Sequence, residues 1–402
     1  MSEKPFVAVN FPADNSGCYF YRMLAPKLMV QSVINNVTFT ETSRFIADPE
    51  WFQDVNLCHM QRQVNDPQCD YYTRFIVPLG QRNGMWIVYN VDDAVGMDDI
   101  PKYNSAWEAY QNPKLMQNIS TMMQQSDFVL VTTEYLKDYY VRKFGVQKEN
   151  VLVIPNYLPK WWMGQYYDLG KILVNYDKNK KKPRLGIIAS STHYDLHGKN
   201  DYVDDFTEMI PFIKKTVNKY QWVFVGCVPN GLQEELKAGK IELVGGSNIM
   251  NYPDVIGNIN CQAIIQPLLN NEFNRCKSNI KFLEACAIGT PLIAQRINIY
   301  EPYTDLLFDD MNELQQKLNM VLGSKDKFKS IVKKQKKELD SGRGGRGWWL
   351  ENPHNLEDWA QFYRLTKKCL NIDLNMILQH EKQEKSQKEQ ENISKDLEIV
   401  RW

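Results

Sequence analysis

Residues 271–294, NEFNRCKSNIKFLEACAIGTPLIA, decide the fold of this chain. They predict a polar loop, then a helix, then a short buried strand. The helix prediction depends on apolar residues from Ile280 to Ile288, which recur at three- and four-residue spacing and so share one face. Glycine accepts left-handed backbone angles and proline cannot continue the hydrogen-bond ladder, so Gly289-Thr290-Pro291 ends this helix.

The polar loop brings Arg275, Lys277 and Ser278 to the start of the helix, with Lys281 one turn in and Glu284 further along. Free N–H groups at a helix start attract phosphate oxygens, and nearby cations reinforce them. A carboxylate two turns in can accept hydrogen bonds from ribose hydroxyls. The stretch therefore suits a nucleoside diphosphate, and the alternative is an ordinary amphipathic helix with a solvated basic start.

The same stretch resembles the donor-sugar motif of retaining glycosyltransferases with the GT-B fold, in the large group related to sucrose and glycogen synthases (group 1, family-four-like). That group often carries two acidic residues separated by seven others. Glu284 matches the second acid, whereas Cys276 stands at the first position, as in a branch with the loop form FNxCKSxxKxLE. The resemblance implies that the loop backbone, Lys277 or Ser278 takes over the sugar contact of the missing acid.

Size and composition set wide limits. The 402 residues are enough for two domains, and 43% hydrophobic residues allow large cores. Lys plus Arg and Asp plus Glu both number 48, so the net charge argues neither for nor against a polyanionic partner. The eight cysteines form no CxxC pair, and the five histidines lack metal-ligand spacing. We expect reduced cysteines, no metal and no signal peptide or membrane span, hence a cytoplasmic protein (host cytoplasm if phage-encoded).

The first half of the chain predicts a doubly wound domain. A strand, a loop around Gly17 and a helix at 21–29 form its start, although GxGxxG is absent. This resembles the GCGYYR-type opening of many GT-B enzymes, whose loop faces the interdomain cleft. The resemblance implies that Gly17 and Arg22 face the donor, and the alternative is that Arg22 anchors the loop. Strands are expected at 6–10, 54–60, 85–91, 128–132 and 151–154.

Asp92 and Asp93 directly follow the predicted strand at 85–91. Carboxylates just past the carboxyl end of a strand lie where open α/β sheets bind ligands. The pair resembles the DDD found at this point in related transferases, which implies a catalytic role for Asp92 and an acceptor-side role for Asp93. The alternatives are a metal site or a helix cap.

The second half predicts strands at 184–191, 222–226, 241–244 and 263–267. After the first of them, STHYDLHGKND resembles a GSxTHxxDL turn of the same branch. That resemblance implies donor contact by Thr192, a catalytic place for His193 near the pyrophosphate or the attacked sugar carbon, and an acceptor-side place for Asp195. A lone histidine can equally be structural. His197 and Lys199 are lesser candidates.

The expected fold is α/β of the GT-B type: two Rossmann-like domains facing across a cleft, with a C-terminal helix that crosses back to the first domain. We expect an acceptor-side domain at 1–170, a linker at 171–183, a nucleotide-sugar domain at 184–350, the returning helix at 351–372 and a charged tail at 373–402. The basic segments 178–184 and 325–346 are by default solvated, and they permit contact with nucleic acid.

The resemblance implies a hexosyl- or pentosyltransferase that uses a nucleotide-sugar donor, a UDP-sugar by preference, with retention. The alternatives are a non-catalytic nucleotide-sugar-binding protein and a sugar epimerase or phosphorylase on the same fold. Proteins of this kind occur in bacterial envelope pathways and in large phages, so the acceptor is a cell-envelope glycan or a hydroxymethylated pyrimidine in DNA. The expected catalytic residues are His193, Lys277 and Asp92; the expected donor-binding residues are Gly17, Arg22, Thr192, Arg275, Ser278, Lys281 and Glu284; Asp93 and Asp195 are expected on the acceptor side.

Overall fold

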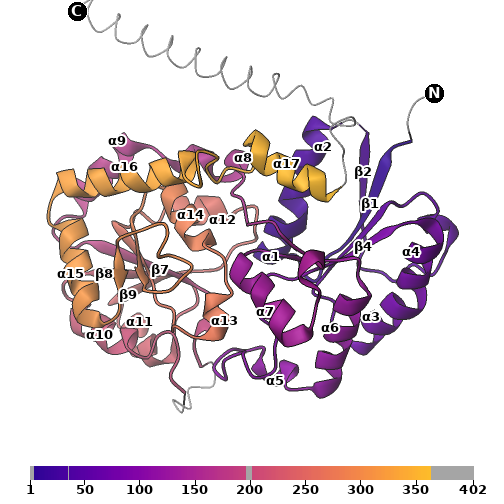
Figure 1. The fold of residues 1–402 in the computed structure, drawn as a ribbon. Helices are drawn as coiled ribbons and strands as arrows, with labels where there is room; N and C mark the ends of the chain where they lie inside the picture. The colour runs from indigo at the N-terminus through magenta and orange to yellow at the C-terminus, as the bar shows by residue number, and fades with distance from the viewer. Residues whose placement is uncertain (1–3, 35, 196–201, 364–402) are drawn as a thin grey trace, which may run out of the picture.

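The computed structural model describes residues 4–34, 36–195 and 202–363, which form two α/β domains side by side (Figure 1). Each domain contains a six-stranded sheet in which the neighbouring strands run parallel. Parallel sheets bury both faces under helices, which explains the continuous apolar runs of the predicted strands. The expectation of two Rossmann-like α/β domains is confirmed.

The first sheet has the order β2-β1-β3-β4-β5-β6. The five predicted strands are all present, and β2 at the sheet edge was not predicted. Only Val37 of β2 is buried, so its sequence lacks the apolar run of an inner strand. The strands are β1 (Phe6–Phe11), β2 (Val37–Glu41), β3 (Leu57–Gln61), β4 (Trp86–Asn90), β5 (Phe128–Val131) and β6 (Val151–Val153).

Helices cover both faces of this sheet (Figure 1). The helix predicted at 21–29 starts earlier and ends later, because α1, a π-helical turn at Phe20–Leu24 and α2 follow one another without a break. Thr133 caps α7 by accepting a hydrogen bond from the Leu136 N–H, and Gly145 ends that helix with φ of 64°. The helices are α1 (Gly17–Tyr19), α2 (Ala25–Val33), α3 (Asp66–Tyr71), α4 (Val77–Asn83), α5 (Trp107–Tyr110), α6 (Pro113–Gln125) and α7 (Glu134–Phe144).

The second sheet has the order β12-β11-β10-β7-β8-β9. The stretch 271–294 forms α13, α14 and β11, so its loop–helix–strand prediction is confirmed, with an added short helix in the loop. The strands are β7 (Arg184–Ala189), β8 (Gln221–Gly226), β9 (Ile241–Val244), β10 (Ala263–Gln266), β11 (Leu292–Gln295) and β12 (Leu307–Phe308).

The segment expected as a linker is not an extended connection, because residues 171–178 of it belong to helix α9. Tyr176 of α9 is buried in the core of the second domain and stacks near Phe328 of α16. The remaining helices are α8 (Lys160–Met163), α9 (Leu169–Lys178), α10 (Met209–Thr216), α11 (Gln233–Lys237), α12 (Tyr252–Gly257), α13 (Glu272–Arg275), α14 (Ile280–Ala287), α15 (Met311–Leu322), α16 (Lys325–Ser341) and α17 (Pro353–Phe362).

Helix α17 crosses back to the first domain and packs against α2 (Figure 1). Its Trp359 is buried over the guanidinium of Arg22, and its Phe362 lies against the ring of His59. The returning helix therefore behaves as expected as far as residue 363. The charged tail expected at 373–402 lies outside the described residues.

The apolar core extends across both domains. One buried cluster runs from Ala8 and Leu130 in the first sheet to Ile264 and Leu292 in the second. A second cluster fills the other side of the first domain and includes Cys276 from the loop of the second. The two domains are therefore joined by shared apolar packing. Among the described helices, none has both the length and the apolar character that crossing a membrane requires.

Candidate functional site

A cavity of about 780 Å³ lies between the two domains. Its walls come from segments that follow the carboxyl ends of β1, β4 and β6 in one sheet and of β7 and β10 in the other. Open α/β sheets bind ligands at this edge. The cavity brings together these residues predicted from the sequence: Gly17, Asp92, Asp93, Thr192, His193, Lys277, Ser278, Lys281 and Glu284.

The start of α14 presents free donors to this cavity. Asn279 precedes the helix, and its side chain does not cap it. Within the described residues, no hydrogen bond is recorded for the N–H groups of Ile280 and Lys281, both of which line the cavity. The first turn of a helix carries a partial positive charge on such groups, so this wall favours an anion.

Lys277 adds a full positive charge beside the helix start. Its Nζ lies 4.9 Å from the ring centroid of Phe273, and no carboxylate within 4.0 Å is recorded for it among the described residues. Burial lowers the pKa of Lys277, while the carboxylates of Asp93 and Asp205 partly offset that effect. An ammonium group that faces a cavity without a direct carboxylate partner is suited to a phosphate oxygen.

Glu284 is buried, and protein hydroxyls occupy much of its carboxylate. Tyr21 from the first domain donates to Oε1 at 3.0 Å, and Tyr252 donates to Oε2 at 2.7 Å. Lys281 lies 2.9 Å from Oε2. Burial alone would lower the pKa of Lys281, but the charge of Glu284 raises it. A carboxylate has about four acceptor positions, so room for a ribose hydroxyl remains beside the two tyrosines.

His193 is held by a buried carboxylate that the sequence did not single out. Its Nδ1 lies 2.7 Å from Oδ2 of Asp205. The other oxygen of Asp205, Oδ1, accepts hydrogen bonds from Tyr103 and Asn274. Burial, and then the charge of Lys277, lowers the pKa of His193 below its usual value. The neutral ring then donates from Nδ1 to Asp205, which leaves Nε2 as an acceptor.

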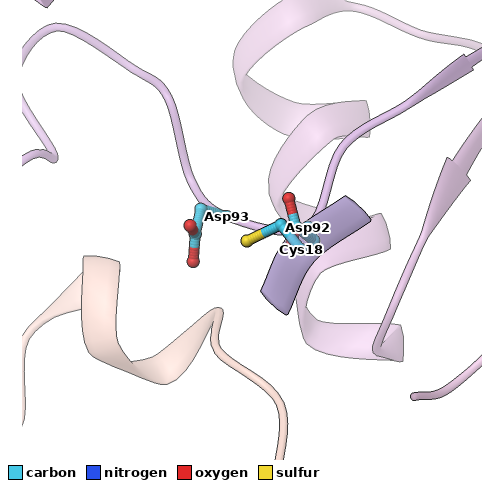
Figure 2. A group of neighbouring side chains, drawn as sticks. All are labelled: Cys18, Asp92 and Asp93. Carbon is cyan, nitrogen blue, oxygen red and sulfur yellow. The ribbon is translucent and has the colours of Figure 1, made fainter. Parts of the chain in front are cut away.

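Asp92, Asp93 and Cys18 meet on the first-domain wall, and Figure 2 shows their three side chains. The Cys18 sulfur and one oxygen of each carboxylate lie within 4.8 Å of one another. Arg62 lies among three carboxylates, with nitrogens 2.6 Å from Asp14, 3.4 Å from Asp92 and 3.6 Å from Asp93, so its single charge offsets only part of theirs. Burial and the neighbouring Asp92 raise the pKa of Asp93. Neither aspartate caps a described helix, so the capping alternative is wrong.

Arg22 does not face the donor, and the prediction that it does is wrong. Its side chain is fully buried and donates to the backbone oxygens of Ile154 and Val131 and to the amide of Asn156. Burial lowers its pKa to about 10. The alternative that Arg22 anchors the loop is the one the structure supports, because the guanidinium links the π-helical turn Phe20–Leu24 to the ends of β5 and β6.

Two further predicted residues lie outside the large cavity. Arg275 borders a different cavity and donates from Nε to Asn270 at 2.6 Å. Asp195 does not line the large cavity, and its backbone N–H donates to Asp204. Neither Arg275 nor Asp195 therefore lines the large cavity. His197 and Lys199 lie outside the described residues.

Gly17 of the first-domain loop and Cys276 of the donor motif differ from the simplest expectation. Gly17 lines the cavity, but a Cβ added to it would meet nothing within 4 Å, so the fold itself does not require glycine there. Cys276, at the position of the missing acid, is fully buried in the apolar core of the first domain. Its thiol cannot reach a sugar in the cavity.

Several cavity residues were missed by sequence reasoning. Tyr21, Tyr252 and Arg62 carry ordinary residue types, and each becomes important only through a partner far away in the chain, such as Glu284 for the two tyrosines. The only available signals were local: Tyr21 precedes the arginine that was singled out, and Arg62 follows a predicted strand end.

Comparisons with known proteins place the fold. No protein-family profile and no curated protein sequence matches the chain. The HepE protein of Anabaena, in complex with UDP and glucose, aligns with a TM-score of 0.58 and 10% identity over 90% of this chain and 99% of that chain. A glycosyltransferase from Rickettsia africae aligns with a TM-score of 0.56 and 14% identity over 92% and 99%. WaaG, a glycosyltransferase involved in lipopolysaccharide biosynthesis, gives 0.51 and 11% over 84% and 95%.

These likenesses extend over nearly the whole of both chains and establish the architecture. Two parallel-sheet domains, with a cavity where the carboxyl ends of both sheets meet, constitute the GT-B fold. The GT-B prediction made from the sequence is therefore confirmed at the level of the fold.

Proposed function

We propose that this protein is a glycosyltransferase that binds a nucleoside diphosphate sugar, a UDP-sugar by preference, in the cavity between its domains. The observation that carries the proposal is the convergence of Lys277 and the free N–H groups of α14 on one cavity wall. The likeness to HepE, which was solved with UDP-glucose, supports the choice of donor.

In this proposal the positively charged cavity wall at the start of α14 stabilises the leaving group. Lys277, Ser278 and the start of α14 take up the negative charge that grows on the diphosphate as its bond to the sugar carbon breaks. Glu284 accepts hydrogen bonds from the ribose. His193 faces the sugar with Nε2, while Asp205 fixes its ring. Each of these groups is already positioned by packing, so little reorganisation is needed during reaction.

We also propose that the reaction proceeds with retention, as the resemblance to retaining enzymes implies. The acceptor oxygen attacks the anomeric carbon from the face that the diphosphate leaves, and its proton passes to the departing phosphate oxygen. The new glycosidic bond then has the configuration of the donor bond. Proton NMR of the product reports this configuration, and the opposite anomer would rule out retention.

The acceptor is proposed to enter beside Asp92 and Asp93, where its hydroxyl meets carboxylates whose charge Arg62 offsets in part. A cell-envelope glycan and a hydroxymethylated pyrimidine in DNA are both kept as acceptor classes. The basic helix α16 does not line the cavity, so it gives no direct support to DNA. Mobility shifts with modified and unmodified DNA distinguish the two, since DNA binding must weaken as salt increases.

The proposal is tested by Lys277→Met. Loss of one charge-assisted phosphate contact weakens binding of UDP by about tenfold or more. Folding is spared, because no carboxylate within 4.0 Å is recorded for Lys277 among the described residues. Calorimetric titration with UDP and UDP-glucose measures the effect.

The matched control is Lys333→Met, which removes an exposed lysine of α16. It should leave nucleotide affinity unchanged. Equal affinity in the wild type and in Lys277→Met, or no binding of any nucleotide sugar, would refute the proposed donor site.

A second candidate function is a nucleotide-sugar-binding protein without turnover. The burial of Cys276 in the first-domain core favours it, because no acid is available at that position to contact the sugar. Donor hydrolysis or transfer by the purified protein separates the two: binding without either reaction supports this second candidate. An epimerase or phosphorylase would instead release a free sugar product or a sugar phosphate without any acceptor.

A further inference from the structure

A second cavity, of about 330 Å³, borders the loop that precedes α14. It is also formed by both domains: the end of β5 and the start of α7 contribute from the first, and the segment 275–279 contributes from the second. Asn156 and Ser278 line both cavities, and Asn156 donates to the Ser278 hydroxyl at 3.0 Å. The two cavities therefore adjoin each other at this hydrogen bond.

Positive charge dominates the second cavity. Arg275 and Arg343 line it, and neither forms an ion pair with a described carboxylate. The guanidinium carbon of Arg343 lies 5.3 Å from the ring centroid of Tyr157 and 5.4 Å from that of Trp348, and the guanidinium donates to the Tyr157 hydroxyl at 2.6 Å. The acidic residue on the lining is Glu134, which is exposed and lies in the first turn of α7.

A helix start faces the same space. Helix α7 begins at Glu134, and Thr133 caps only the N–H of Leu136. No hydrogen bond is recorded among the described residues for the N–H groups of Glu134 and Tyr135, which line the cavity. Two arginines and a helix start from opposite domains therefore converge on one small space, an arrangement that attracts an anion.

Buried polar atoms without partners point independently to a ligand. Thr132 is 1% exposed and Asn279 is 6% exposed, and both line the cavity. The Thr132 hydroxyl and the Asn279 Nδ2 have no hydrogen-bond partner within the described residues, and neither does Oδ1 of Asn298, a third lining residue. Native proteins pair nearly all such groups, so these atoms have hydrogen-bonding capacity left for a molecule that enters the cavity.

We propose that this second cavity binds a small phosphate monoester that also carries a hydroxyl group. The phosphate is held by Arg275, Arg343 and the start of α7, while Asn279 and Thr132 donate to the ligand and Asn298 accepts from its hydroxyl. The volume fits a small metabolite rather than a nucleotide sugar. Because its walls come from both domains, the bound ligand stabilises their contact, and it does so whether or not the large cavity binds a donor.

The test uses glycerol 3-phosphate, with glycerol and inorganic phosphate as comparison probes, in calorimetric titrations at fixed ionic strength. Arg275→Gln should weaken binding of glycerol 3-phosphate by about tenfold or more, because it removes a charge-assisted hydrogen bond. Thr132→Val should also weaken it, and it keeps the fold because it removes a buried hydroxyl that has no protein partner. Arg296→Gln, an arginine paired with Asp309 at the surface, is the matched control and should bind like the wild type.

Lys277→Met separates the two cavities. Binding of glycerol 3-phosphate should be unchanged by this substitution, whereas UDP binding weakens by about tenfold or more if the proposed donor site is correct. If Lys277→Met abolishes the binding of glycerol 3-phosphate and Arg275→Gln leaves it intact, the phosphate occupies the large cavity and the inference is overturned. The absence of binding to the wild type overturns it as well, and neither outcome bears on whether UDP binds.

Discussion

At the scale of single residues, Glu284 combines two tasks. It faces the proposed donor, and it also compensates the charge of Lys281, whose side chain is 28% exposed. Glu284→Ala should therefore destabilise the protein by about 3 kcal/mol, since it leaves a largely buried ammonium without its partner. The loss of folding stability accompanies the loss of donor affinity, and urea unfolding measures it.

Tyr252→Phe is the control for this prediction. It removes the hydrogen bond to Glu284 and the one that Lys281 donates to the Tyr252 hydroxyl, but it keeps the ion pair, so it should cost about 1–2 kcal/mol. Equal stabilities for the two variants would show that the ion pair between Lys281 and Glu284 does not stabilise the fold.

His59 makes stability depend on pH. It is fully buried, and burial, followed by the charge of Arg22, lowers its pKa from 6.5 to about 3. The unfolded chain therefore binds one more proton than the folded chain between these values, so stability is lost as the pH falls below about 6.5. In His59→Gln the unfolding equilibrium constant should change less with pH, by a factor of about three between pH 7 and 6 and about eight between pH 6 and 5. Urea unfolding at pH 7, 6 and 5 measures the slopes, and identical slopes would contradict the assignment.

At the scale of elements, the turn after α14 is the point where this helix meets α9. Gly289 has φ of 68°, and an added Cβ would lie 2.2 Å from Cδ1 of Ile172 in α9. Gly289→Ala should destabilise the fold by about 2–4 kcal/mol, because it adds overpacking to backbone strain.

Gly239→Ala is matched to this change. Gly239 has φ of 65°, but an added Cβ there meets nothing within 4 Å. Its cost should therefore be only the backbone strain, about 1 kcal/mol. Chemical denaturation of both variants isolates the contact with α9, and equal losses would show that the contact is not required.

The elements were largely predictable because their signals are local. The apolar spacing that predicted α14 and the apolar runs that predicted the inner strands depend on neighbouring residues. Two strands were missed: β2 carries one buried residue, and β12 has two residues, which is too short for a pattern. Helix α9 was missed as well, because its segment ends in the lysine-rich run that we interpreted as a linker.

The site was predictable only where a motif is continuous in the chain. Lys277, Ser278, Lys281 and Glu284 lie in one stretch, and the structure places them in one cavity. Arg22 was misplaced because its partners, such as the carbonyl of Ile154, are far away in sequence. Burial of a guanidinium among distant carbonyl groups leaves no mark on the residues beside it.

At the scale of the whole molecule, α17 carries the end of the described chain onto the first domain. Trp359 is 1% exposed, and its ring centroid lies 5.4 Å from the guanidinium carbon of Arg22. Trp359→Ala should reduce stability by about 3–5 kcal/mol, because it opens a large cavity and removes the cover of a buried cation.

Trp161→Ala is the control, since Trp161 is 42% exposed and should cost much less. Scanning calorimetry of the two variants compares them. Similar melting temperatures would indicate that α17 contributes little to the joined structure.

The placement of Phe273 and Cys276 in the apolar core of the first domain has a consequence for how the molecule can be divided. The loop that presents Lys277 belongs to the second domain in the sequence, but its apolar side chains pack in the core of the first domain. If the second domain were produced on its own, it would expose these two apolar side chains, and the loop before α14 would lose its packing. The proposed pyrophosphate site therefore requires both domains, and the second domain alone would not keep it.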